Sequence, residues 1–319
     1  MKKKAFVSAL GRMGRNHARG LAKCGYDLVT IEPDISNIDL FRSELKDSNL
    51  DCMVDFIDRP SSHYAAAIFS ETVPSRLANL KNFIKFAKAD KFLIEKPITS
   101  DPLELDEFLK LSISEGLDIS VNFSRRAWPH IRTLAKLCHE ETSFVVMING
   151  GAVGLGCNGI HFLDMFLDLC GEDVPEIESV SLSDRLIDSG RGKRFKDIGG
   201  DFTLRGRRGS LYASLSSESS AGVFVTIRGS RFIAYLDYIN WSWKLVQRDP
   251  SSELPTYRYG AEYRVIDEGH TLVPNPSEIT ERWVRGSLQL PSLDRALVAH
   301  NLLFDILAHG GMNPPYRFT

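Results

Sequence analysis

The sequence has few cysteines, no long apolar run and no excess of charge of one sign. Its five cysteines are an odd number and form no CxxC pair, which argues against a disulfide framework and favours a reducing, cytoplasmic location. No run of about 18 apolar residues occurs, so we expect no transmembrane helix, and the short run after the first lysines is too short for a signal peptide. Lys plus Arg is 39 against Asp plus Glu 41, which gives no general attraction to nucleic acid or to a membrane. A small-molecule partner is therefore expected.

The pattern of apolar residues changes near residue 125, and with 319 residues this predicts two domains. Before that point short apolar runs alternate with helical patterns, which is typical of a doubly wound parallel sheet covered by helices. The runs are at 5–10, 27–32, 65–71, 91–95 and 118–123. We therefore expect an α/β Rossmann domain over residues 1–124.

In residues 125–319 the pattern of apolar residues differs, and strand-like runs dominate. These runs lie at 144–149, 211–217, 222–228, 231–239 and 241–248. They predict an α+β domain built on a large, mostly antiparallel open sheet. A helical pattern returns over 276–309, and this terminal helix is expected to pack back toward the first domain.

A glycine-rich turn follows the first predicted strand in "AFVSALGRMGRNHARG". Ala9, Gly11 and Gly14 occupy the three positions of the dinucleotide-binding pattern G-x-G-x-x-G. Gly11 would let the backbone approach a pyrophosphate, and Gly14 would allow close packing of the helix, whose N-terminus favours an anion. Ala9 departs from the pattern, and a plain strand-to-helix turn is the alternative.

The second predicted strand ends in "IEPD", which supplies an acid at the expected place. Glu32 lies 32 − 11 = 21 positions after Gly11, close to the spacing of the carboxylate that binds an adenosine ribose. Such an acid accepts from a 2′-hydroxyl and repels a 2′-phosphate, so NAD is favoured over NADP. Asp34 is the rival acid, and a solvated strand end without a role is the other alternative.

Four motifs together resemble one family. "LGRMGRNHA", "IEKPIT", "NFSRRAWP" and "NGIHFLD" occur in the order and approximate spacing of the Gfo/Idh/MocA oxidoreductases. The resemblance implies an NAD(P)-dependent oxidoreductase that moves a hydride between nicotinamide and a ring carbon of a sugar, cyclitol or nucleotide-activated sugar. It also implies that the second domain binds the substrate and forms a homodimer or homotetramer through its sheet.

By the same resemblance, Lys96 and His161 are the catalytic residues. Lys96 would donate to the reacting oxygen and His161 would accept the proton of an alcohol; an ordinary strand-end lysine and a packing histidine are the alternatives. The family has a proline about 22 residues before this lysine, which selects Pro74 over Pro60 because 96 − 74 = 22. The expected cofactor-binding residues are Gly11, Arg12, Met13, Gly14, Glu32, Thr72, Pro74, Glu95 and Lys96.

The expected substrate-binding residues are Arg126, Asn158 and Asp164, and no metal site is expected. For Arg126 an ion pair at the domain junction is an equal alternative. Better-known members of the family carry an aspartate where this chain has Cys157, so Asn158, Asp164, substrate or water would have to assist His161. A non-enzymatic dinucleotide-binding regulator of the same fold, and a redox-neutral NAD-dependent epimerase or glycosidase, are the alternative functions.

Overall fold

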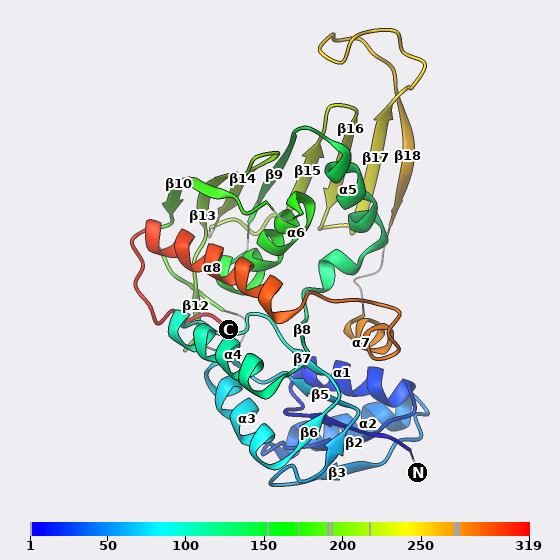
Figure 1. The fold of residues 1–319 in the computed structure, drawn as a ribbon, viewed down its shortest axis with the longest axis vertical. Helices are drawn as coiled ribbons and strands as arrows, with labels where there is room; N and C mark the ends of the chain where they lie inside the picture. The colour runs from blue at the N-terminus through cyan, green and yellow to red at the C-terminus, as the bar shows by residue number, and fades with distance from the viewer. Residues whose placement is uncertain are drawn as a thin grey trace.

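The computed structural model describes residues 2–151, 153–171, 173–189, 192, 194–216, 218–270 and 275–319. Two large sheets, one of six and one of eight strands, lie at opposite ends of the molecule (Figure 1). The first is parallel and covered by helices, whereas the second is mostly antiparallel, which confirms the predicted fold class. None of the helices in the described ranges is long and apolar enough to cross a membrane.

The six-stranded sheet has the strand order β3-β2-β1-β5-β7-β8. Its strands are β1 (Lys4–Val7), β2 (Asp27–Thr30), β3 (Val54–Phe56), β5 (Ala66–Phe69), β7 (Phe92–Ile94) and β8 (Ile119–Val121). They alternate with helices α1 (Arg12–Lys23), α2 (Ile35–Asp47), α3 (Val73–Phe86) and α4 (Pro102–Glu115). β4 (His63–Tyr64) and β6 (Lys88–Ala89) form a separate two-stranded pair. The order reverses between β1 and β5, and ligands of open α/β sheets bind at such a switch point.

Buried apolar side chains explain why these short segments form strands. All four residues of β5 and all three of β7 are buried, as expected where helices cover both faces of a parallel sheet. Four of the six strands lie within the predicted apolar runs, and β1 begins one residue before its run. The sixth strand, β3, lies outside these runs, and its residues are only half-buried because it lies at the sheet edge.

The eight-stranded sheet has the order β10-β13-β14-β9-β15-β16-β17-β18, with only β9 and β14 parallel. Its strands are β9 (Phe144–Gly151), β10 (Glu176–Leu182), β13 (Gly200–Arg205), β14 (Gly209–Ser216), β15 (Phe224–Arg228), β16 (Phe232–Asp237), β17 (Ser242–Arg248) and β18 (Tyr263–His270). The pair β11 (Ile187–Asp188) and β12 (Lys196–Asp197) lies beside it. The sequence analysis did not predict β10, β13 or β18. Two of these, β10 and β18, are edge strands that expose most of their side chains.

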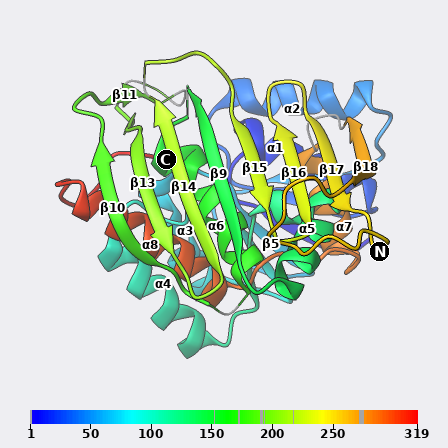
Figure 2. The same cartoon turned by 90° about the horizontal axis from the view of Figure 1, so that it is seen from above.

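Helices cover one face of this sheet and leave the other open. Figure 2 shows α5 (Pro129–Glu140), α6 (Ile160–Cys170) and α8 (Leu293–His309) behind the strands. On the opposite face, Tyr212, Met147 and Tyr235 are exposed, and the strand register places them in one row across β14, β9 and β16. This apolar row fits the expected oligomer interface, which stays a prediction.

The last third of the chain returns to the first sheet. α7 (Pro276–Val284) packs against α1, where a side chain at Gly20 would overlap the backbone of Ser277. The amide of Val121 in β8 donates to the carbonyl of Pro291, just before α8. The predicted boundary at 124/125 falls at a short 3₁₀ turn, Ser124–Ala127, and this division stays a prediction.

Candidate active site

A cavity of about 560 Å³ lies where the glycine turn meets the segment before α6. From the first part of the chain it is lined by Gly11, Arg12, Met13, Ser70 and Thr72, and from the second by Cys157 and Asn158. Five of these seven residues were predicted at the cofactor or the substrate. The structure therefore brings the cofactor turn and the start of the predicted catalytic helix to one cleft.

The glycine turn has room for a ligand at Gly11 but none at Gly14. A side chain at Gly14 would overlap the carbonyl of Ala9, so only glycine allows α1 to approach β1 this closely. At Gly11 no atom of the described residues lies within 4 Å of the position a Cβ would take. Gly11 precedes α1, and no side chain in the described ranges caps the helix, which leaves its first N–H groups available to an anion.

Glu32 and Asp34 have different positions at the end of β2. The amide of Leu10, in the glycine turn, donates to Glu32 Oε2 at 2.7 Å. Asp34 instead caps α2 by accepting from the amide of Ser36 at 2.9 Å. Glu32 is thus the acid next to the turn, as a ribose-binding carboxylate requires, and Asp34 has a structural partner.

The side chain of Lys96 reaches the segment before α6. The bond between Lys96 and Pro97 is cis, and Lys96 Nζ donates to the carbonyl oxygen of Cys157 at 2.6 Å. Only 7% of Lys96 is exposed. This contact joins the predicted catalytic lysine to the turn that leads into His161.

Two buried side chains that the sequence did not single out hold the turn after Lys96. The Arg76 guanidinium donates to the carbonyls of Glu95, at 2.8 Å, and of Pro97 and Ile98. His300 in α8 accepts from the amide of Ile98 at 2.8 Å and donates through Nδ1 to its own helix. Both act on backbone groups, so no local spacing marks them.

Glu95 and Pro74 lie beside the cleft rather than in its lining. Glu95 is 2% exposed and binds the His17 ring at 2.7 Å and the Asn122 amide at 2.6 Å. Burial alone would raise the pKa of Glu95, but these two partners lower it to about 2. Pro74 is in the first turn of α3, whose N-cap Thr72 lines the cavity. A direct cofactor contact of Glu95 or Pro74 stays a prediction.

His161 lies in the first turn of α6, after a π-helical turn over Leu155–Gly159. Its Nδ1 is buried and finds no hydrogen-bond partner among the described residues. Burial lowers the pKa of His161 well below its usual value, and the charges of Lys96 and Arg125 lower it further. The ring is therefore neutral near pH 7 and able to accept a proton.

Asp197, from β12, is a buried carboxylate that binds the backbone of the turn before α6. It accepts from the amides of Gly156 and Cys157, each at 2.9 Å, and its charge acts on Lys96. Burial raises the pKa of Asp197, and the amide hydrogen bonds oppose this. The Cys157 thiol donates to the carbonyl of Thr319 at 3.0 Å. Sequence reasoning missed Asp197, because it lies 40 residues from Cys157 on a two-residue strand.

Arg126 and Asp164 pair with each other. Arg126 Nη2 lies 2.5 Å from Asp164 Oδ1, and Nη1 lies 2.9 Å from Asp168. Asp164 is 1% exposed, and burial raises its pKa to about 6 despite the adjacent guanidinium. The geometry is that of the ion-pair alternative. A substrate contact of Arg126 or Asp164 stays a prediction.

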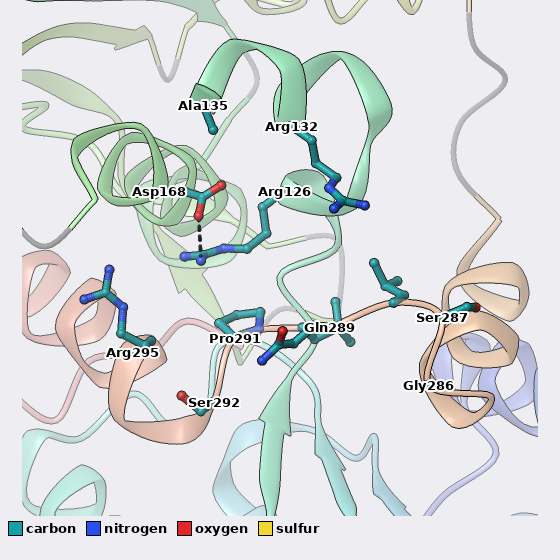
Figure 3. A pocket seen from close by; sticks show the side chains of 12 residues that line it. Arg126, Arg132, Ala135, Asp168, Gly286, Ser287, Gln289, Pro291, Ser292 and Arg295 are labelled. Carbon is teal, nitrogen blue, oxygen red and sulfur yellow. Dashed lines mark hydrogen bonds and ion pairs between the residues drawn. The ribbon is translucent and has the colours of Figure 1, made fainter. Parts of the chain in front are cut away.

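Arg126 also lines a second cavity, of about 540 Å³, between the helices and the segment 286–292. Figure 3 shows Arg126, Arg132 and Arg295 around it, with Asp168 bound to Arg126. None of the residues that line the cofactor cleft borders this cavity. Asn158, by contrast, lines the cofactor cleft, and its substrate contact stays a prediction.

Comparison with known proteins shows which solved structures share this fold. No model of a known protein family matches the chain, and no curated protein matches its sequence. Solved structures do match over nearly the whole length. UDP-N-acetylglucosamine 3-dehydrogenase GnnA from Acidithiobacillus ferrooxidans has a TM-score of 0.69 at 16% identity and covers 97% of both chains.

Two further solved structures have the same architecture. An oxidoreductase from Agrobacterium radiobacter, in complex with NAD⁺, L-tartaric acid and magnesium, has a TM-score of 0.70 at 12% identity and covers 98% of this chain and 97% of its own. A super-repressor mutant of Gal80p from Saccharomyces cerevisiae has a TM-score of 0.68 at 11% identity, with the same coverage. The chain therefore has the two-domain fold of the Gfo/Idh/MocA-type oxidoreductases.

Proposed function

We propose that the protein is an NAD-dependent oxidoreductase that moves a hydride between nicotinamide and a ring carbon of a sugar, cyclitol or nucleotide-activated sugar. The contact between Lys96 and the Cys157 carbonyl carries the proposal, because it brings the lysine to the helix start that bears His161. Similarity to GnnA, a dehydrogenase of a nucleotide-activated sugar, supports the substrate class.

The residues around the cleft fit NAD. The uncapped N-terminus of α1 would hold the pyrophosphate, the open space at Gly11 would admit it, and Glu32 would accept from the ribose. NAD, when bound, supplies the acceptor or donor of the hydride.

In alcohol oxidation, Lys96 would donate a hydrogen bond to the reacting oxygen, and His161 would take its proton. The C–H bond breaks as its electron pair leaves with the hydride, and the O–H electrons form the new C=O bond. A neutral imidazole is needed at the start, which the low pKa of His161 provides. Ketone reduction reverses each transfer.

The experiment compares Lys96→Ala and His161→Asn with wild type on a sugar and cyclitol panel, monitoring NADH absorbance. We expect kcat to fall by about 10²-fold or more in each variant, while the Kd for NAD changes little. Exposed Lys85→Ala and His309→Asn are the matched controls and should behave as wild type. Unchanged turnover in both site variants would refute the assigned roles.

A non-enzymatic regulator is the second candidate, because Gal80p shares the fold. NAD binding without turnover on the whole panel would support it. A redox-neutral epimerase or glycosidase predicts instead that NAD remains bound through gel filtration and that substrate is converted without net NADH. The neutral base beside Lys96 favours an enzyme over a regulator.

A further inference from the structure

Arg125 is a half-buried cation with no carboxylate partner among the described residues. Its Nη1 is enclosed and has no hydrogen-bond partner among the described residues, and no acid in those ranges is near enough to act on its pKa. Burial lowers the pKa of Arg125, and only Tyr238 opposes this. Arg126, the next residue, binds two aspartates instead.

The guanidinium lies beside the proposed base. Its central carbon is 3.9 Å from the ring centroid of Phe162 and 4.8 Å from that of Tyr238. Phe162 follows His161 directly, and the charge of Arg125 acts on the His161 ring. The charge of Arg125 is therefore felt at the ring that would meet a substrate oxygen.

The other cation near His161 has acidic neighbours. The charge of Lys96 acts on both Glu95 and Asp197, so negative charge is close to it. Arg125 has only two aromatic faces in the described part of the chain. Cation–π attraction is weaker than the cost of removing a guanidinium from water without a counter-ion. The free protein thus holds a positive group that a bound anion would balance.

We propose that Arg125 binds a carboxylate of the substrate, so that the substrates are sugar carboxylates rather than neutral sugars. This inference rests on the proposed function. A guanidinium binds a planar carboxylate through two parallel hydrogen bonds, and one negative charge balances its single positive charge. A phosphate dianion would leave a negative charge uncompensated in a partly dry site. The bound carboxylate would also offset the effect of Arg125 on His161 and make the ring a stronger base.

The test uses the NAD-saturated full chain with three hexuronates, D-glucuronate, D-galacturonate and D-mannuronate, each paired with its neutral hexose. Tm shifts and NADH absorbance are measured at equal concentrations, with D-glucose 6-phosphate as the phosphate probe. We expect at least one hexuronate to give a larger response than its hexose. Equal responses within every pair, including none, would overturn the inference, as would a preference for the phosphate.

Arg125→Gln should raise the Kd for that hexuronate about 10- to 100-fold, which is the effect of losing a charged hydrogen-bond pair. Arg132→Gln, on the exposed second cavity, is the matched control and should keep the preference. The Tm of free Arg125→Gln should not fall, because the variant removes an unbalanced buried charge. A lower Tm with the hexuronate preference retained would show a structural arginine instead.

Failure of the proposed function gives a different result. In that case either NAD would not raise the Tm of wild type or Arg125→Gln, or NAD would raise it while no sugar of the panel, acidic or neutral, changes the NADH absorbance. If NAD stabilises both proteins equally and only the hexuronate response separates them, Arg125 acts on the substrate and not on the cofactor.

Discussion

His300 should make the protein less stable in mild acid. The ring is 0% exposed, donates from Nδ1 to the Ala296 carbonyl at 2.8 Å and accepts at Nε2 from the Ile98 amide at 2.8 Å. A proton on Nε2 would break the second bond and bury a charge. Burial lowers the pKa of His300 to about 4, and the charges of Arg76 and Lys96 add to this.

The sign and size follow from proton linkage. In the unfolded chain a histidine has a pKa of about 6.5, so the unfolded state takes up this proton first as the pH falls. The contribution of His300 to the free energy of unfolding is therefore constant above about pH 6.5. Between about pH 6.5 and 4 it falls by about 1.4 kcal/mol per pH unit, or about 3 kcal/mol in all.

Urea unfolding of wild type and His300→Gln between pH 7.5 and 4 measures this loss. The variant should be less stable at pH 7, because its amide replaces the ring imperfectly, and the gap should close by about 3 kcal/mol at pH 4. His309→Gln is the control, since exposed His309 also donates to the carbonyl four residues earlier. Parallel curves for wild type and His300→Gln would refute the reasoning.

Three further predictions test the cleft and the open sheet. Gly14→Ala should lower the free energy of unfolding by about 1–3 kcal/mol or more, as measured by thermal melts. Gly11→Ala should keep the Tm of wild type but bind NAD more weakly, as measured by calorimetry. Asp197→Asn sets an amide NH₂ against backbone N–H groups, so it should cost about 1–3 kcal/mol and lower kcat, with an unchanged Kd for NAD. Phe224 of β15 is exposed on the same face of the open sheet as Met147. Phe224→Lys with Met147→Lys should shift an oligomer to monomer in light scattering, and an unchanged mass would exclude this face as the interface.

Local patterns determined much of the fold. Alternating apolar runs predicted both sheets, because burial of one or both faces of a strand leaves a period in the sequence. Edge strands such as β10 and β18 were not predicted, since they bury few side chains and their sequences show no such period. The glycine turn was readable for the same local reason: Gly14 must lack a side chain to pass the Ala9 carbonyl.

The sequence by itself thus determined the fold class, the glycine turn and the acid Glu32, because each depends on residues close together in the chain. Only the tertiary structure decided that Asp197 lies under Cys157, that His300 and Arg76 hold the turn after Lys96, and that Arg126 rather than Arg125 takes the aspartates. These partners are separated by 19 to 202 residues, and no spacing rule relates them. Their contacts arise when the two sheets and α8 pack around one cleft, and that packing left Arg125 without a counter-ion in the described chain.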